Sequence, residues 1–580
     1  MTEVAAPAEA SKVKVLRRLW TEYCKQELGS ISIGLGALAV NAYTNLSFPS
    51  IIGKCVDLVS AADGSAATVD GESFNNFMVS TFKTLLCGAA ASLLRVYCLG
   101  TANSRIQARL KMSLFNSYID KDIDFFENSS NTKGEILTII DTDTVAASDA
   151  FTTNIANGLR SLNSSINGSI QLFRTSAELC GVSLSVVPLV GIGAMTISKY
   201  SRKLQNALRQ RQGAVLDYSI ERFMNISTVK LNNRESHEKQ TYESHNAEVL
   251  GLSSRYFLSQ GVFMSFINAA TNVSIMSILY VGAALMRKGK MTSGTLTKFA
   301  MTSAFVGLGF SGLSTFYSDM SRSVEATRRL LRVIDDNSGG KGKRGTSPLA
   351  TGSSSSSSTF RFEGVSFAYK SRPDELVLNN VSVSVARGGI TGFVGKSGCG
   401  KTTVLSLICG LHEPSSGRIF FGDTDISTMG SEWIRQNVGV VEQKLSLFSG
   451  SIYDNIAYGK AGSSSEEVER AAKLAFASDF IDAFPDKYQT QVGTGGQLLS
   501  GGQSARIALA RALIKQPAFL LLDEATGSLD EESERFIIDA LLMLSKTTTI
   551  IVFTHSEKLA KSCACVHLVQ GGVIDEGRKD

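Results

Sequence analysis

The chain has 580 residues, of which 43% are hydrophobic, and a formal net charge of +5. Since a single hydrophobic core seldom grows beyond about 250 to 300 residues, we expect more than one folding unit. Lys and Arg are scattered instead of forming a basic stripe, which argues against nucleic acid as a partner. Nine cysteines without a regular framework predict reduced thiols instead of a secreted disulfide scaffold. The N-terminus lacks an apolar core and carries acidic side chains, so we expect no cleaved targeting segment in this chain.

Long apolar runs precede residue 320 and an ordinary soluble mixture follows, which predicts a membrane domain at 1–336. Five runs suit membrane helices, because each is near the roughly 20 residues needed to cross the hydrocarbon core. A further helix is expected at 154–174, which makes six spans. Two charged intervals, 100–150 and 199–255, contain few helix breakers and predict helices that continue beyond the bilayer on the inner side. The five apolar runs cover 29–52, 77–99, 175–198, 257–286 and 294–317.

The helix expected at 154–174 is unusually polar for a membrane span. At 100° per residue, one narrow stripe is apolar and the opposite face carries hydroxyl, amide and guanidinium groups. Charges in hydrocarbon are costly, whereas a face toward a water-filled cavity satisfies them. The alternative places Arg160 in the inner extension, Arg174 at the outer end and the amides between helices. The polar face consists of Asn157, Arg160, Ser164, Asn167, Gln171 and Arg174.

The segment 337–359 is rich in Gly and Ser and reads as a flexible linker to a second domain at 360–580. There the strand ITGFVG runs into a loop that matches G-x-x-x-x-G-K-S/T in a strand–loop–helix setting. Backbone N–H groups of such a loop surround phosphate oxygens, Lys401 neutralises phosphate charge and the Thr402 hydroxyl ligates Mg²⁺. The candidate phosphate-binding residues are Gly395, Lys396, Ser397, Gly398, Cys399, Gly400, Lys401, Thr402 and Thr403.

Two further motifs complete the predicted nucleotide chemistry. The apolar strand in FLLLDEAT ends at Asp523, which would lie beside Mg²⁺, and Glu524 would take a proton from attacking water. The stretch LSGGQ opens a helix and is a second phosphate-binding arrangement. Since the first loop already forms a complete cradle, the chain carries two half-sites. The second half-site consists of Ser500, Gly501, Gly502 and Gln503.

These motifs, together with FTHS, resemble the nucleotide-binding domain of an ABC ATPase over about 360–580. In that family two domains enclose two ATP molecules head to tail, each between the phosphate loop of one subunit and the LSGGQ of the other. The resemblance implies that Tyr369 stacks on adenine and that Gln443 ligates Mg²⁺ and senses both the ion and the membrane domain. It also implies that Asp530 belongs to the dimer-contacting loop and that His555 contacts the γ-phosphate.

The inner segments Asp122–Thr144 and Glu221–Tyr242 resemble the intracellular loops of B-subfamily ABC exporters, whose coupling helices sit on the ATPase surface. The last apolar runs look most like mitochondrial inner-membrane half-transporters of the erythroid type, with the antigen-processing type second. The implied fold is a six-span α-helical membrane domain of exporter type in a domain-swapped homodimer, followed by an α/β P-loop ATPase domain. A heterodimer with another half-transporter is the alternative, as are other endomembranes or the plasma membrane for location.

The implied activity is ATP- and Mg²⁺-dependent export, away from the ATP side of the bilayer, with two equivalent hydrolytic sites at the dimer interface. A homodimer would place four arginines of the polar helix near the pathway, so we hypothesise an anionic or amphipathic substrate. A lipid flippase and a peptide exporter are alternatives of the same architecture. An ATP-gated channel or a regulatory membrane subunit would have nearly the same sequence features.

Overall fold

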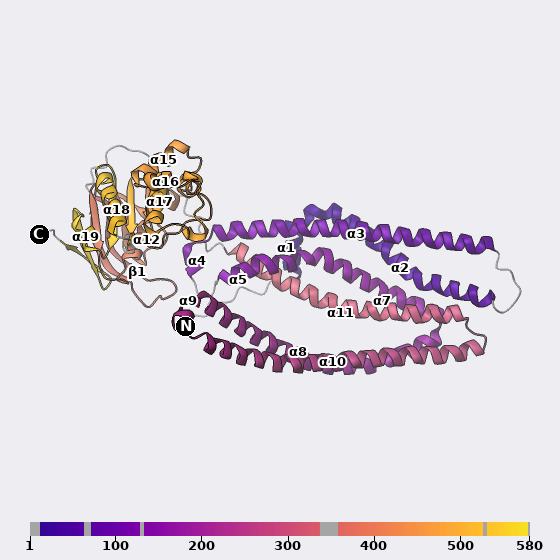
Figure 1. The fold of residues 1–580 in the computed structure, drawn as a ribbon. Helices are drawn as coiled ribbons and strands as arrows, with labels where there is room; N and C mark the ends of the chain where they lie inside the picture. The colour runs from indigo at the N-terminus through magenta and orange to yellow at the C-terminus, as the bar shows by residue number, and fades with distance from the viewer. Residues whose placement is uncertain (1–11, 63–70, 128–132, 337–357, 526–530, 578–580) are drawn as a thin grey trace. The chain divides into compact units, whose positions relative to one another are not determined.

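The computed structural model describes residues 12–62, 71–127, 133–336, 358–525 and 531–577 (Figure 1). These residues fold into two compact units. One holds the residues up to Lys111 together with Asp141–Leu330, and the other holds Met112–Ile140 together with the chain from Leu331 onward. The segment 112–140 thus groups with the C-terminal unit, although it lies within the predicted domain 1–336. The domain boundaries drawn along the sequence stay a prediction, and the predicted linker 337–359 lies almost entirely outside the described residues.

The first unit is built from helices, and six described helices have 21 residues or more. Helices α3, α8 and α10 run without a break into the charged intervals, as their lack of helix breakers predicts. The bounds are α1 Lys12–Leu19, α2 Leu28–Ala62, α3 Gly71–Ile119, α6 Thr144–Asp149, α7 Ile155–Thr175, α8 Ala177–Met224, α9 Ile226–Leu231, α10 Glu235–Arg287 and α11 Ser293–Asp335.

Three helices among the described residues are long and apolar enough to cross a membrane. They contain the predicted runs 77–99, 257–286 and 294–317. The other predicted spans fall on α2, α7 and α8, and the six-span arrangement therefore stays a prediction. The three qualifying segments are Asn75–Ile119, Glu235–Arg287 and Ser293–Asp335.

Helix α7 packs its small residues against α11. A Cβ added at Gly158 would lie 2.6 Å from a ring carbon of Phe316, and one added at Gly309 would lie 2.7 Å from Ser165 Oγ. At Gly309 the backbone nitrogen of Ser165 would also lie 2.9 Å from the added Cβ, so the two helix backbones approach closely there, whereas at Gly158 the missing side chain leaves room for the Phe316 ring. In the apolar stripe of α7, Ile155 is half-buried and the other members are exposed: Leu159, Leu162, Ile166, Ile170 and Phe173.

The second unit holds two sheets. An antiparallel sheet has the order β2-β1-β4-β5, and a larger sheet with a parallel centre has the order β10-β9-β3-β8-β7-β6. The strands are β1 Ser358–Phe367, β2 Leu378–Ala386, β3 Ile390–Val394, β4 Ser416–Phe421, β5 Thr424–Asp425, β6 Val438–Val441, β7 Phe519–Asp523, β8 Thr549–Thr554, β9 Cys565–Gln570 and β10 Val573–Gly577. The helices are α4 Ile123–Glu127, α5 Lys133–Thr138, α12 Lys401–Ile408, α13 Ser431–Asn437, α14 Ile452–Ala457, α15 Ser465–Leu474, α16 Ser478–Ala483, α17 Gly501–Leu513, α18 Glu531–Leu544 and α19 Glu557–Lys561.

Strand β7 shows why this sheet has a core on both faces. Successive side chains of a strand point to opposite faces. Leu520 and Leu522 pack into the core that includes α14, α15, α17 and α18, whereas Phe519 and Leu521 pack into the core shared with β1, β2 and α12. A strand buried on both faces reads as a continuous apolar run. The chemistry-bearing residues therefore follow at its carboxyl end, where the loops after β3, β6, β7 and β8 meet.

Candidate functional site

The phosphate loop lies between β3 and α12, as the motif predicts. Gly398 and Gly400 have φ values of +81° and +107°, a left-handed region that favours glycine. The Lys401 side chain is 4% exposed, and its Nζ donates to the carbonyl oxygens of Gly395 at 2.7 Å and Lys396 at 3.0 Å. Its ammonium group thus folds back over the loop that it follows.

The Glu524 carboxylate gathers three of the predicted site residues. Its Oε1 lies 3.1 Å from Lys401 Nζ and 3.5 Å from His555 Nδ1, and its Oε2 accepts from Gln443 Nε2 at 2.6 Å. Gln443, Glu524 and His555 follow β6, β7 and β8, which are neighbours in the sheet. Because these strands are parallel, their carboxyl ends bring together residues far apart in sequence.

Glu524 also has an unusual backbone. Its φ is +45°, which is uncommon for a residue with a side chain, and its N–H donates to Phe553 O at 2.8 Å. A strained conformation of this kind persists only where the surrounding structure enforces it, and it concentrates at functional sites. The side chain is 11% exposed and is therefore largely screened from bulk water.

Asp523 fits the predicted role of a magnesium ligand. Its Oδ2 accepts from Thr402 Oγ1 at 2.7 Å, while its buried Oδ1 has no hydrogen-bond partner among the described residues. Burial raises the pKa of Asp523, against the opposing effect of the Thr402 hydrogen bond. A buried carboxylate oxygen beside a hydroxyl is the hard donor set that Mg²⁺ prefers, and a bound cation would favour the ionised form.

The LSGGQ residues make local contacts at the start of α17. Ser500 Oγ accepts from the Gln503 N–H at 3.2 Å, and Gln503 Oε1 accepts from the Ser500 N–H at 2.9 Å. Ser500 and Gly501 are exposed, whereas Gly502 is buried. Within the described chain no hydrogen bond or ion pair joins them to the phosphate loop. Asp530 lies outside the described residues.

Tyr369, predicted to stack on adenine, is half-buried beside the phosphate loop. Its hydroxyl and Thr403 Oγ1 are 3.0 Å apart. Its ring meets Phe367 and His412 edge-on, with centroid distances of 5.0 Å and 5.4 Å. His412 was not predicted, because a lone histidine after a helix carries no motif.

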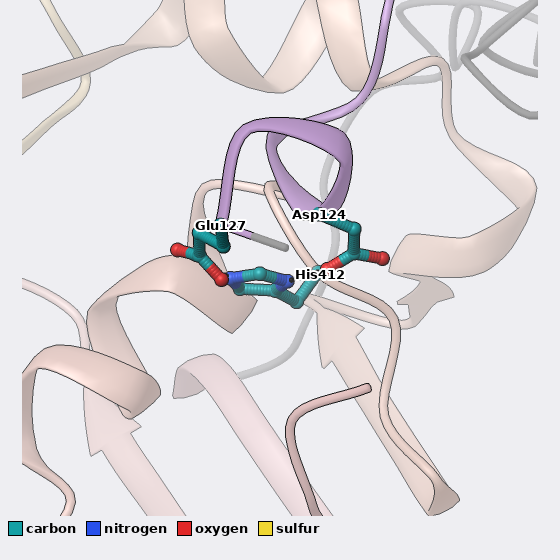
Figure 2. Close-up of side chains that lie close together, drawn as sticks. All are labelled: Asp124, Glu127 and His412. Atoms are coloured by element: carbon teal, nitrogen blue, oxygen red, sulfur yellow. Dashed lines mark hydrogen bonds and ion pairs between the residues drawn. The ribbon is translucent and has the colours of Figure 1, made fainter. Parts of the chain in front are cut away.

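His412 connects this corner to α4, which lies in the predicted intracellular segment 122–144. Its Nδ1 is 2.8 Å from Asp124 Oδ1 and its Nε2 is 3.7 Å from Glu127 Oε1 (Figure 2). Lys370 Nζ lies 2.6 Å from Asp124 Oδ2. Burial opposes ionisation of Asp124, but the Lys370 and His412 contacts outweigh it and lower its pKa. Sequence reasoning identified the segment and missed these contacts.

The helical unit contains a cavity of about 660 Å³ between α2 and α7. Four residues of the predicted polar face line it: Arg160, Asn167, Gln171 and Arg174. Asn157 and Ser164 are not among the lining residues. They lie at the margin of the polar face that is far from Leu159 and Ile170, whereas the side of α7 that lines the cavity includes Leu159 and Ile170. Gln171 Nε2 also donates to Ser50 Oγ of α2 at 2.8 Å.

The α2 wall of this cavity is mainly apolar, and the α7 wall is mainly polar. No acidic residue is among the lining residues. In the described part of the helical unit, neither Arg160 nor Arg174 forms an ion pair with a carboxylate. The α2 residues that line the cavity are Leu35, Leu38, Ala39, Ala42, Tyr43, Leu46, Ser47 and Ser50.

Comparison with protein families matches both parts of the chain. Residues 31–308 match the ABC transporter transmembrane region, and residues 378–527 match the ABC transporter model that covers the phosphate loop and Asp523. The second segment, with the Glu524 geometry, is an ATPase domain.

Individual relatives extend the similarity over nearly the whole chain. ATP-binding cassette sub-family B member 10, mitochondrial, from Mus musculus is 34% identical over 95% of this chain and 76% of its own length. The ABC multidrug transporter mdr2 of Aspergillus fumigatus is 32% identical over 99% of this chain and 72% of its own length. The mitochondrial potassium channel ATP-binding subunit of Homo sapiens is 32% identical over 94% of this chain and 73% of its own length. The chain therefore belongs to the ABC transporter family, as a membrane protein that couples ATP hydrolysis to transport.

Proposed function

We propose that the protein is a homodimeric exporter that moves an amphipathic or anionic solute away from the ATP side of its membrane. The ATP-hydrolysing half of the proposal rests on the Glu524 carboxylate, which contacts Lys401, Gln443 and His555. The transport half rests on the cavity lined by Arg160 and Arg174. We also propose that each subunit has six membrane spans and that the dimer is domain-swapped.

At the ATP site the residues have distinct roles. Lys401 exchanges its contacts with the Gly395 and Lys396 carbonyls for phosphate oxygens, since its ammonium group already lies over the loop. Thr402, Asp523 and Gln443 would hold Mg²⁺, and the ion when bound would supply positive charge next to the phosphates. Glu524 accepts the proton of the attacking water, and Gln443 and His555 position that water and the γ-phosphate.

The sandwich of two ATPase domains would supply the half-site that each phosphate loop lacks. Ser500 stands at the exposed N-terminus of a 13-residue helix, where backbone N–H groups and the helix dipole favour an anion. One chain carries one copy of each half-site, so two copies form two complete sites. A heterodimer with another half-transporter would satisfy the same geometry.

The substrate class follows from the two walls of the cavity. Leu35, Leu38 and Leu46 offer an apolar surface, while Arg160 and Arg174 offer positive charge. Since the cavity lining carries no acidic residue, an anionic group of the substrate would neutralise these arginines. A volume of about 660 Å³ in one subunit lies within the range of small-molecule sites.

Substitution at Arg174 tests the substrate class. The Arg174→Ala protein should lose about 10-fold in apparent affinity for an amphipathic carboxylate that stimulates its ATPase, because a charge-assisted hydrogen bond is removed. The methyl ester of the same compound should be affected much less. Arg174→Lys keeps the charge and serves as the control. Equal effects on acid and ester would contradict the anionic assignment.

Transport itself is tested in sealed vesicles with the ATPase domain outside. ATP should drive accumulation of an amphipathic anion against its gradient, and vanadate should stop this accumulation.

A channel or regulatory membrane subunit is the second candidate, because one relative is named as a potassium channel subunit. In that case planar-bilayer recordings would show ATP-dependent conductance without accumulation. Two relatives are named as mitochondrial proteins, which supports a mitochondrial membrane as the location, and the inner membrane is part of the proposal.

A further inference from the structure

Arg506 lies in the second turn of α17, the helix that begins at the LSGGQ half-site. Its guanidinium carbon lies over two aromatic rings, 4.7 Å from the centroid of Phe480 in α16 and 5.2 Å from that of Phe536 in α18. Its Nη1 donates to the carbonyl oxygen of Phe476 at 3.0 Å, and its Nε donates to that of Gly502 at 3.4 Å. One side chain therefore joins the start of α17 to three other segments of the ATPase domain.

The chemistry of these contacts suits arginine. A guanidinium group is planar, so its faces stack on aromatic rings while its edge donates hydrogen bonds. A cation over such a ring is attracted by the negative charge of the π-system. Hydrophobic packing of neighbours such as Ala505 and Ala508 buries α17 without setting a direction, because that effect is non-directional. The contacts of Arg506 are directional, and they therefore fix the position and the rotation of the helix start.

Two of the contacted segments are themselves held in place. Phe476 has a φ of +52°, and this left-handed conformation, uncommon for a residue with a side chain, persists where the surrounding structure enforces it. In α18, Glu534 Oε1 accepts from Ser556 Oγ at 3.1 Å, and Ser556 follows His555 of the ATP site. The Phe536 ring thus belongs to a helix that is fixed next to the ATP site of its own subunit.

The half-site has an exposed side and a held side. Ser500 and Gly501 are exposed, and the hydrogen bonds between Ser500 and Gln503 stay within one turn. Helical side chains lean toward the N-terminus of their helix, so Arg506 reaches back to Gly502, which is buried. The exposed side is available to a phosphate group, while the side that Arg506 contacts sets where this turn stands.

We propose that Arg506 is a positioning residue for ATP hydrolysis, which holds the start of α17 where Ser500 meets the ATP bound to the other subunit. The inference rests on the proposed head-to-tail sandwich of two ATPase domains. In that sandwich a change at Arg506 acts on the site formed by the phosphate loop of the other subunit. It lowers turnover there and leaves nucleotide binding at its own phosphate loop intact.

Mixed dimers of the full-length protein in lipid nanodiscs test this assignment by the placement of two substitutions. In the first dimer Lys401→Ala is on one subunit and Arg506→Met on the other, so the intact phosphate loop meets an unaltered α17. In the second dimer both substitutions are on one subunit, and the intact phosphate loop meets the altered α17. A different affinity tag on each subunit allows both dimers to be purified.

The second dimer should hydrolyse saturating ATP about 5- to 30-fold more slowly than the first, as expected when one or two such contacts are lost. Binding of a fluorescent ATP analogue should be equal in the two dimers. A loss of stability moves both dimers together, because they contain the same substitutions and differ only in placement. Equal turnover in the two dimers, or slower turnover in the first, would overturn the proposal.

Two matched variants define the contact. Arg470→Met makes the same change at an exposed position of α15 and should give equal turnover in both placements. Phe536→Leu keeps an apolar side chain and removes the ring, so it should depend on placement as Arg506→Met does. Both changes together should be no worse than Arg506→Met alone, because they remove one shared contact. Fully additive effects would count against the contact with Phe536.

Ser500→Arg in place of Arg506→Met separates this inference from the proposed function. If turnover depends on the placement of Ser500→Arg and is independent of the placement of Arg506→Met, the role of Arg506 is wrong and the proposed dimer stands. If neither placement matters, the head-to-tail arrangement has failed and the inference fails with it.

Discussion

Single residues of the ATP site were predictable because their chemistry fixes their spacing. A loop around phosphate requires glycine at left-handed positions, and Gly398 and Gly400 adopt them. An apolar strand that ends in Asp523 and Glu524 puts two carboxylates at the edge of a buried sheet. In contrast, the contact between His412 and Asp124 joins residues that are 288 positions apart, and nothing in the local sequence of either residue predicts it.

Replacing Glu524 with glutamine should lower ATP turnover at least about 100-fold, because a general base contributes that much or more. Glutamine has nearly the same shape as glutamate and still forms hydrogen bonds, but it cannot accept the proton of the attacking water. Turnover is measured as phosphate release, with ATP binding measured in parallel and expected to persist. Glu442→Gln changes an exposed neighbouring carboxylate and should be nearly neutral. Wild-type turnover in Glu524→Gln would refute the assignment of the base.

Cys399 offers a second prediction at the residue scale. Its thiol lies within the phosphate loop and is partly exposed, so alkylation should block ATP binding and abolish turnover. Bound ATP should protect against the loss. The Cys399→Ser protein, which keeps the other eight cysteines, should resist the reagent. Full activity after mass spectrometry has verified labelling of Cys399 would contradict this prediction.

At the scale of elements, helices α7 and α11 depend on small residues where they touch. The helix at 155–175 was predicted within one residue at each end, because its hydrophobic periodicity is helical. Its environment was only partly predictable. Projection of the sequence separates an apolar stripe from a polar face, but it does not tell which face meets α11 and which lines the cavity.

A methyl group at Gly158 should destabilise this helix pair. In Gly158→Ala the new Cβ would press on the Phe316 ring, and overpacking of this kind costs about 1 to 3 kcal/mol. Thermal unfolding in detergent should show a lowered Tm. Gly307→Ala places the same methyl group on α11, where nothing lies within 4 Å, and should leave the Tm unchanged or raised. Equal Tm values for the two variants would argue against close packing at Gly158.

At the scale of the whole molecule, the two half-sites predict complementation between inactive subunits. Lys401→Ala disables the phosphate loop, and Ser500→Arg disables the facing helix terminus. Each variant alone puts one defect in both sites of a homodimer. In a mixed dimer with head-to-tail sites, one site carries both defects and the other carries none.

Coexpression of the two variants, each with its own affinity tag, should therefore restore up to about a quarter of wild-type ATPase activity if sites act independently and subunits pair at random. Each variant expressed alone should stay inactive. Tandem purification through both tags verifies that mixed dimers have formed. If verified mixed dimers hydrolyse no ATP, then either the head-to-tail arrangement or the independence of the sites is wrong.

The sequence by itself determined the ATPase chemistry, the helical character of the membrane part and the polar face of α7. These depend on short-range rules, since glycine geometry, strand alternation and helical periodicity act over a few residues. Only the tertiary structure decided that Glu524 contacts Gln443 and His555, that α2 supplies the apolar wall of the cavity, and that His412 meets α4. Those contacts arise because parallel strands and packed helices bring distant segments together, and no local pattern encodes which segments will meet.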